Sequence, residues 1–152
     1  MTEQLVKTTS EDAIYTILLA RPDKRNAISD RLLAALEAAL VATPEGTRAI
    51  ILAGEGKHFC AGLDLSEHQH RDAFGTMLHS QSWHRIFARI QNGGIPVIAA
   101  MQGAVIGGGL ELATAAHIRV AEPSTIYQLP EGRHGIYVGG GASVRVAKIV
   151  GA

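Results

Sequence analysis

Apolar residues follow two different spacings along this chain. Short runs rich in β-branched and apolar residues are typical of strands. Longer stretches in which apolar residues recur every three or four positions are typical of amphipathic helices. The pattern predicts strands at residues 13–19, 49–53, 97–101, 117–121 and 125–128, and helices at residues 30–43, 72–91, 110–116 and 142–150. Strands that alternate with helices predict an α/β domain.

Local signals refine two of these elements. Ser29 is a favoured N-cap residue, and Leu32, Leu36 and Leu40 then share one face of the helix that follows it. The run Ala-Ile-Ile-Leu-Ala at 49–53 is apolar throughout, which is typical of a strand buried on both faces of a sheet.

The composition limits the class of partner. The chain has 152 residues, which predicts one domain, and its 14 basic residues balance 14 acidic ones. A neutral chain has no electrostatic basis for binding nucleic acid or an anionic membrane surface, so we expect neither. An anionic ligand would have to be held by local groups.

The single cysteine and the N-terminus bear on the compartment. Cys60 has no second cysteine with which to form an internal disulfide, which fits a reducing compartment. The first ten residues are polar and lack the apolar core of a signal peptide. The most apolar stretch, residues 95–110, is short for a membrane span and contains Pro96 and several glycines. We therefore expect a cytoplasmic protein.

Histidines are frequent, but their spacing predicts no metal site. His68, His70, His79 and His84 fit no standard ligand set, and no cysteine pair or H-E-x-x-H accompanies them. Cys60 is interpreted as a small buried side chain rather than a nucleophile.

Two glycine-containing turns could present backbone amides to a ligand. The first is Phe-Cys-Ala-Gly-Leu-Asp-Leu at 59–65, and the second is the triple glycine at 107–109. The second turn opens a helix, where free N–H groups and the positive end of the helix dipole favour negative charge. Each turn also fits a purely structural role. A dinucleotide or P-loop site is a poor fit, because the glycines do not match G-x-G-x-x-G and no G-K-[ST] follows.

Two glutamates near apolar surroundings are candidates for acid–base chemistry. Glu111 lies in the first turns of the helix after the triple glycine, and Glu131 follows Leu129-Pro130. Two carboxyl groups in one apolar site could divide the roles of acid and base. Either residue alone could instead be solvated or cap a helix.

Four segments together resemble the crotonase (enoyl-CoA hydratase/isomerase) family in order and spacing. They are Arg-Pro-Asp-Lys-Arg-Asn-Ala-Ile at 21–28, the loop at 59–65, Gly-Ala-Val-Ile-Gly-Gly-Gly-Leu-Glu-Leu-Ala at 103–113, and Leu-Pro-Glu at 129–131 followed by Gly135 and the glycines at 139–141. The resemblance covers nearly the whole chain. It implies a crotonase-like spiral of ββα units over residues 1–152.

The resemblance also implies roles for the matched residues. The backbone N–H groups of Leu63 and Gly108 would bind the carbonyl oxygen of an acyl-CoA thioester. Glu111 would activate water and Glu131 would donate a proton at C2, although the division between them is left open. The residues implied in binding CoA or the acyl group are Lys24, Arg25, Ala27, Ala61, Gly62, Asp64 and Leu65.

The activity implied is hydration of a 2-enoyl-CoA without a metal or redox cofactor. CoA counts as part of the substrate rather than as a cofactor. Isomerisation of an enoyl-CoA, hydrolysis of a carbon–carbon bond, or binding of CoA esters by an inactive fragment remain alternatives. Family members are much longer, so the C-terminal helices are expected to be absent here. With that region present, the resemblance implies a homotrimer or a dimer of trimers.

Gly132-Arg133-His134 after Glu131 departs from the family, in which many hydratases are apolar at these positions. If Arg133 and His134 face inward, we expect a polar or unusual acyl group. If they face solvent, they have no such role.

Overall fold

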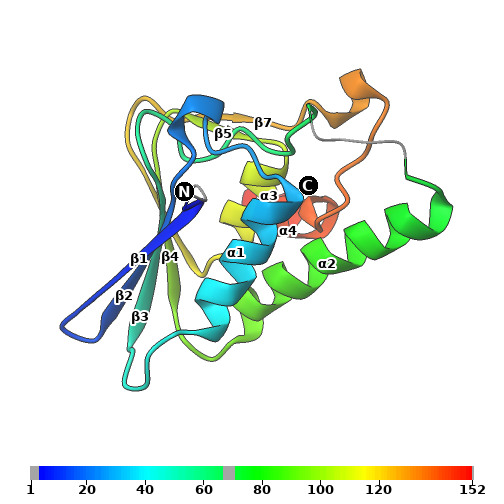
Figure 1. The fold of residues 1–152 in the computed structure, drawn as a ribbon. Coiled ribbons are helices and arrows are strands. Elements are labelled where there is room, and N and C mark those ends of the chain that lie inside the picture. The colour runs from blue at the N-terminus through cyan, green and yellow to red at the C-terminus, as the bar shows by residue number, and fades with distance from the viewer. Residues whose placement is uncertain (1–3, 67–70, 152) are drawn as a thin grey trace.

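A five-stranded sheet forms one side of the molecule in the computed structural model, which describes residues 4–66 and 71–151 (Figure 1). Its strand order is β1-β2-β3-β4-β6, in which β1 and β2 are antiparallel and the other neighbours are parallel. A smaller parallel sheet pairs β5 with β7. The strands are β1 (Val6–Glu11), β2 (Ile14–Leu19), β3 (Ala49–Gly54), β4 (Val97–Met101), β5 (Ala104–Ile106), β6 (Ile118–Ala121) and β7 (Ile126–Gln128).

Helices lie beside the large sheet, and two of them connect its parallel strands (Figure 1). Helix α1 joins β2 to β3, and α2 joins β3 to β4, so that each returns the chain in the same direction, as a parallel sheet requires. The Ser29 hydroxyl accepts a hydrogen bond from Leu32 N (3.1 Å), which confirms the predicted N-cap. The helices and 3-10 turns are α1 (Asp30–Val41), α2 (Ala73–Asn92), α3 (Gly108–Ala115), α4 (Ala142–Val150), η1 (Pro22–Lys24) and η2 (Glu131–His134).

The core lies between the large sheet and the helices. Leu52 of β3, Leu36 of α1 and Ile86 of α2 are all buried within it. Along β3 and β4, burial alternates from one residue to the next. The expectation that residues 49–53 are buried on both faces is therefore wrong, because the helices cover one face and Ile51 on the other keeps intermediate exposure.

The predicted α/β architecture is confirmed, and β4 and α4 coincide with the predicted residues 97–101 and 142–150. The patterning missed β1 and β5. Strand β1 is polar and almost wholly exposed, and a tight turn with positive φ at Asp12 (46°) and Ala13 (64°) holds it against β2. Strand β5 is only three residues long and lies between glycines.

Among the described residues, no helix is both long enough and apolar enough to span a bilayer.

Candidate active site

The loop from 59 to 65 is fixed on two sides by backbone hydrogen bonds. Cys60 forms a parallel bridge with Val105 of β5, and Leu63 forms one with Ile28. In the second bridge, the hydrogen bonds to Ile28 are made by the residues on either side of Leu63. The Leu63 N–H is therefore left out of the bridge, and within the described part of the chain it donates to no protein acceptor.

The first turn of α3 brings a second unbonded amide to the same place. A Cβ atom added to Gly108 would lie 3.6 Å from Leu63 N and 2.5 Å from Trp83 Cζ3. Only glycine permits so close an approach between α3, the loop and the indole ring. Gly108 N, like Leu63 N, donates to no acceptor in the residues described, because it belongs to the open end of a helix.

Glu111, on α3, is bound by the turn that precedes α4. Its Oε1 atom accepts hydrogen bonds from Gly140 N (2.7 Å) and Ala142 N (3.1 Å). The side chain is buried, and burial raises the pKa of this carboxyl above its ordinary value of 4.5. The two amide hydrogen bonds lower the pKa, nearby Glu131 raises it and Arg145 lowers it, but the effect of burial prevails.

Arg145, on α4, supports this turn from behind. Its Nη1 donates to Gly140 O (2.7 Å), its Nε donates to Gln91 Oε1 (2.9 Å), and the guanidinium lies 6.0 Å from the centre of the Phe87 ring. The turn that holds Glu111 is thus itself held by a cation. Arg145 thereby links α4 and α2 to the carboxylate.

Glu131 begins η2 and is also buried, but it is held differently. Its Oε1 would lie 2.9 Å from a Cβ atom on Gly107, which places the carboxyl beside the start of α3. Its Oε2 is shielded from solvent and has no hydrogen-bond partner in the structure. A buried acceptor left without a donor is costly, so such atoms commonly have a functional role or a partner supplied by a ligand.

A cavity of about 660 Å³ joins these groups. Its wall includes the loop, the start of α3, one side of α2, η2 and the glycine turn before α4. The cavity has the size and mixed lining of a small-molecule site. No group of three or more histidine, cysteine or acidic side chains suited to a metal ion occurs among residues 4–66 and 71–151, and His68 and His70 fall outside these ranges.

The resemblance implied catalytic, oxyanion-binding or substrate-binding roles for eleven residues. Seven of them line this cavity and four do not. Lys24 and Arg25 are exposed at η1 and do not belong to the cavity wall. The seven are Ala61, Gly62, Leu63, Leu65, Gly108, Glu111 and Glu131.

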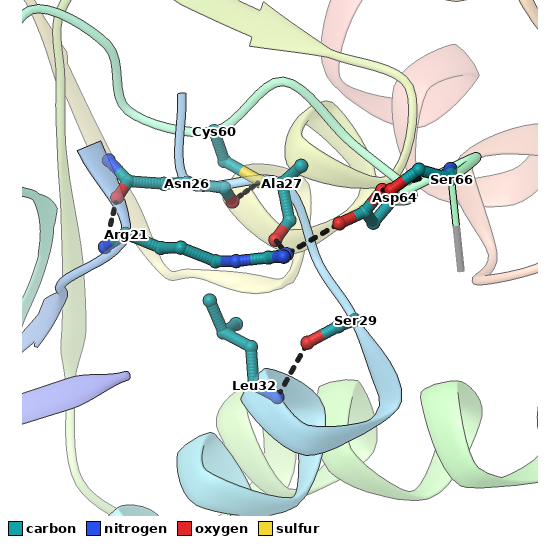
Figure 2. Close-up of polar contacts among 8 residues, drawn as sticks. All are labelled: Arg21, Asn26, Ala27, Ser29, Leu32, Cys60, Asp64 and Ser66. Carbon is teal, nitrogen blue, oxygen red and sulfur yellow. Dashed lines mark hydrogen bonds and ion pairs between the residues drawn. The ribbon is translucent and has the colours of Figure 1, made fainter. Parts of the chain in front are cut away.

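The other two, Ala27 and Asp64, belong to a polar network behind the loop (Figure 2). Arg21 Nη1 donates to Asp64 Oδ2 (2.6 Å) and to Ala27 O (3.2 Å). Burial would raise the pKa of Asp64, but hydrogen bonds from Ser66 and Arg21 prevail, and the pKa lies below the ordinary value of 3.8. The fully buried Asn26 completes the network by accepting from Arg21 N (2.9 Å). Asp64 therefore supports the loop from behind in this structure.

Sequence reasoning missed several parts of the wall. Trp83 lines the cavity beside Gly108, and nothing in the sequence pattern singled it out. Arg71, which the sequence did not single out either, lines the cavity as well. Of the two residues considered as facing inward or outward, His134 lines the cavity and Arg133 does not. The glycines at 139–141 were noted, but nothing in their pattern indicated that Gly140 binds Glu111.

Comparison with known proteins identifies the family. The family model for enoyl-CoA hydratase/isomerase matches residues 9–152. The chain belongs to the enoyl-CoA hydratase/isomerase (crotonase) family. It is 33% identical over 148 residues to a Mycobacterium bovis protein named "probable enoyl-CoA hydratase", and that match covers 97% of this chain and 59% of the relative.

Solved crotonase structures agree with the fold. A candidate enoyl-CoA hydratase from Rhodopseudomonas palustris is 56% identical and superposes with a TM-score of 0.92, over 95% of this chain and 56% of that one. An enoyl-CoA hydratase from Thermoplasma volcanium is 36% identical with a TM-score of 0.93, over 98% of this chain and 60% of that one. The predicted crotonase-like fold is confirmed, and the chain spans little more than half the length of these relatives.

Proposed function

We propose that this site processes acyl-CoA thioesters, and most specifically that it adds water to a 2-enoyl-CoA. One observation carries the proposal. Two backbone amides without protein acceptors, Leu63 N and Gly108 N, lie at one cavity that is also lined by the buried carboxyl groups of Glu111 and Glu131. The names of the relatives support the same class of chemistry.

The two amides would stabilise the charge that develops during the reaction. When water attacks C3 of an enoyl thioester, negative charge moves onto the thioester oxygen as an enolate. Fixed N–H donors at that oxygen stabilise the enolate more than the ground state, and one such donor contributes about 3–4 kcal/mol in comparable sites. The positive end of the α3 dipole behind Gly108 acts in the same direction.

Glu111 is suited to act as the base toward water. Burial raises its pKa, which makes the carboxylate a better proton acceptor near neutral pH. As the water oxygen bonds to C3, Glu111 takes a proton from the water and Glu131 delivers a proton to C2. A proton then returns from Glu111 to Glu131, so the sum of the steps is addition of one water. This route uses neither a metal nor a redox cofactor.

The direct test is hydration of a short 2-enoyl-CoA, followed by loss of the absorbance of the conjugated thioester. Glu111→Gln and Glu131→Gln should each lower the rate by about 10²-fold or more, because each removes a proton-transfer group. Binding of a saturated CoA ester should persist in both. Glu45→Gln, at an exposed glutamate, is the matched control. Full activity in both glutamine variants would end this assignment.

Isomerisation of a 3-enoyl-CoA is a second candidate, which the difference between the two glutamates favours. Two amides restrain Glu111 Oε1, whereas Glu131 Oε2 is unbonded. A single mobile carboxyl could move a proton between C4 and C2 without water. Analysis of the products from a 3-enoyl-CoA separates the two. Isomerised product that persists in Glu111→Gln and is lost in Glu131→Gln would favour isomerisation.

A further inference from the structure

Unpaired buried polar atoms are concentrated in one place in this structure. Within the described residues there are three such side-chain atoms, Arg71 Nη1, Trp83 Nε1 and Glu131 Oε2, and all three residues line the cavity. Native proteins leave few buried polar groups unpaired, so each needs an explanation. The proposed chemistry accounts for Glu131. It does not account for Arg71 and Trp83, both of which are hydrogen-bond donors.

Arg71 is anchored by one arm of its guanidinium. Its Nη2 donates to Asp30 Oδ2 (2.7 Å), and the other oxygen of that carboxylate lies 3.2 Å from His79 Nδ1. Asp30 is 63% exposed and is therefore still hydrated. The Nη1 arm is buried and has no acceptor. A guanidinium held in this way has a pair of N–H groups suited to an anionic oxygen such as a carboxylate.

A continuous wall joins this guanidinium to the thioester end of the cavity. The Trp83 ring lies directly against Gly108, at 2.5 Å from an added Cβ atom. His79 lies one helical turn earlier on the same face of α2, with its ring centre 5.9 Å from that of Trp83. His79 and Arg71 then share Asp30. A chain that starts at the two amides and follows α2 therefore passes Trp83 and approaches Arg71.

Other parts of the cavity lining are polar as well. His134 and Tyr137 contribute to the lining, together with Ser80 of α2. A plain hydrocarbon chain would leave the buried donor of Arg71 unpaired, and an acyl chain that carries an acceptor oxygen would satisfy it. Discrimination between polar and hydrocarbon acyl chains by this wall would be stronger than discrimination by apolar contacts. A site built around polar groups disfavours ligands that cannot pair with them.

We propose that the preferred substrate is a CoA thioester whose acyl chain carries a carboxylate, which binds the unpaired arm of Arg71. The proposal rests on the proposed function to the extent that it needs a thioester bound at Leu63 and Gly108.

The test measures binding, so it does not depend on turnover. Trp83 is the only tryptophan in the chain, and its fluorescence reports on the cavity directly. Saturated esters are used in matched pairs that differ by a terminal carboxylate in place of a methyl group. The pairs are succinyl-CoA with butyryl-CoA, glutaryl-CoA with valeryl-CoA, and adipyl-CoA with hexanoyl-CoA.

In the unsubstituted protein, at least one carboxylated ester should bind about tenfold more tightly than its alkyl partner. Arg71→Met should remove this preference and change the affinity for the alkyl ester by less than about threefold. Arg71→Lys should restore part of the preference, because it returns the charge without the fork of donors. Arg133→Met, at an exposed arginine outside the cavity wall, should leave the preference unchanged.

Two results would overturn the proposal while leaving the proposed function intact. In the first, every alkyl ester binds as tightly as its carboxylated partner in the unsubstituted protein, a result that needs no variant to fold. In the second, Arg71→Met weakens both members of each pair by the same factor, which would assign Arg71 to the shared CoA portion or to the wall itself. Failure of every ester to bind would defeat the proposed function as well.

Discussion

Glu111 is ionisable, buried and bound to two amides, and this combination makes the stability of the protein depend on pH. Its pKa in the folded state is raised, mainly by burial. A carboxyl with a raised folded pKa favours the folded state below its unfolded pKa, near 4.5, and loses that contribution as pH rises through the folded value. Ionised Glu111 therefore destabilises the fold at neutral pH.

Glu111→Gln should increase the free energy of unfolding at pH 7, because it removes the buried charge and keeps a carbonyl oxygen for Gly140 N and Ala142 N. The increase should shrink as pH falls below the raised pKa of Glu111 in the folded protein, where the carboxyl is itself neutral. Urea unfolding at a series of pH values, with Glu45→Gln as control, measures this. A stabilisation of the same size at every pH would contradict the account.

Cys60 carries the only thiol in the chain, and it is buried. Complete burial raises its pKa to about 12, against a weaker opposing effect of a hydrogen bond from Gly62 N. The thiol donates instead to Asn26 O (3.1 Å). It should therefore resist alkylation by iodoacetamide at pH 8 in the folded protein and react fully in denaturant, as followed by mass spectrometry. Fast alkylation of the folded protein would show that the loop opens readily.

At the scale of elements, the contact between α3 and the loop decides whether the two amides meet. A Cβ atom on Gly109 would lie 2.3 Å from Cys60 O, a backbone atom that cannot move aside alone. Gly109→Ala should push α3 from the loop, lower stability by about 1–3 kcal/mol and abolish ester binding. Gly132→Ala is the control, since nothing lies within 4 Å of its added Cβ. Equal behaviour of the two variants would show that this contact is not needed.

Arg145 should act on the reaction through the turn that it supports. Arg145→Met removes the hydrogen bond to Gly140 O and a cation that lowers the pKa of Glu111. We expect a lower kcat with little change in KM, and an acidic limb of the kcat–pH profile that moves to higher pH. Arg145→Lys should recover part of both effects, and Lys148→Met on the exposed side of α4 should have neither. An unshifted pH profile would reduce Arg145 to a structural role.

Spacing alone predicted the helices and the buried strands well, because their apolar residues face one common core. It failed where tertiary contacts replace local patterning. The polar strand β1 exists because β2 offers a free edge, and β5 exists because Cys60 and β7 pair with it. One-sided burial of β3 could not be predicted either, since Ile51 and Leu52 are equally apolar in sequence.

For the whole molecule, the site depends on segments that are distant along the chain. The resemblance to crotonases singled out Leu63, Gly108, Glu111 and Glu131, and the fold places all four at one cavity. It also singled out Asp64, whose carboxylate is bound by Arg21 behind the loop. Residue type and spacing could not distinguish these cases, because Leu63 and Asp64 are neighbours of which one lines the cavity and the other is bound to Arg21.

The polar wall of the cavity could not be predicted from the sequence. Nothing in the spacing of Arg71 or Trp83 separates a cavity wall from an ordinary amphipathic helix. Their importance follows from unpaired donors that only coordinates reveal. The role of Gly140 could not be predicted from the sequence either. Its amide donates to Glu111 because the fold brings the start of α4 beside α3.

The most direct test of the account follows the amide groups of Leu63 and Gly108 by ¹H–¹⁵N NMR during titration with butyryl-CoA, with free CoA as the control. If both amides bind the thioester oxygen, their protons should move downfield more than those of any other residue, and free CoA, which lacks the thioester carbonyl group, should leave them nearly unchanged. Saturable binding with both amide signals unmoved would contradict the account, because the ester would then occupy the cavity without touching the two donors on which the proposed chemistry depends.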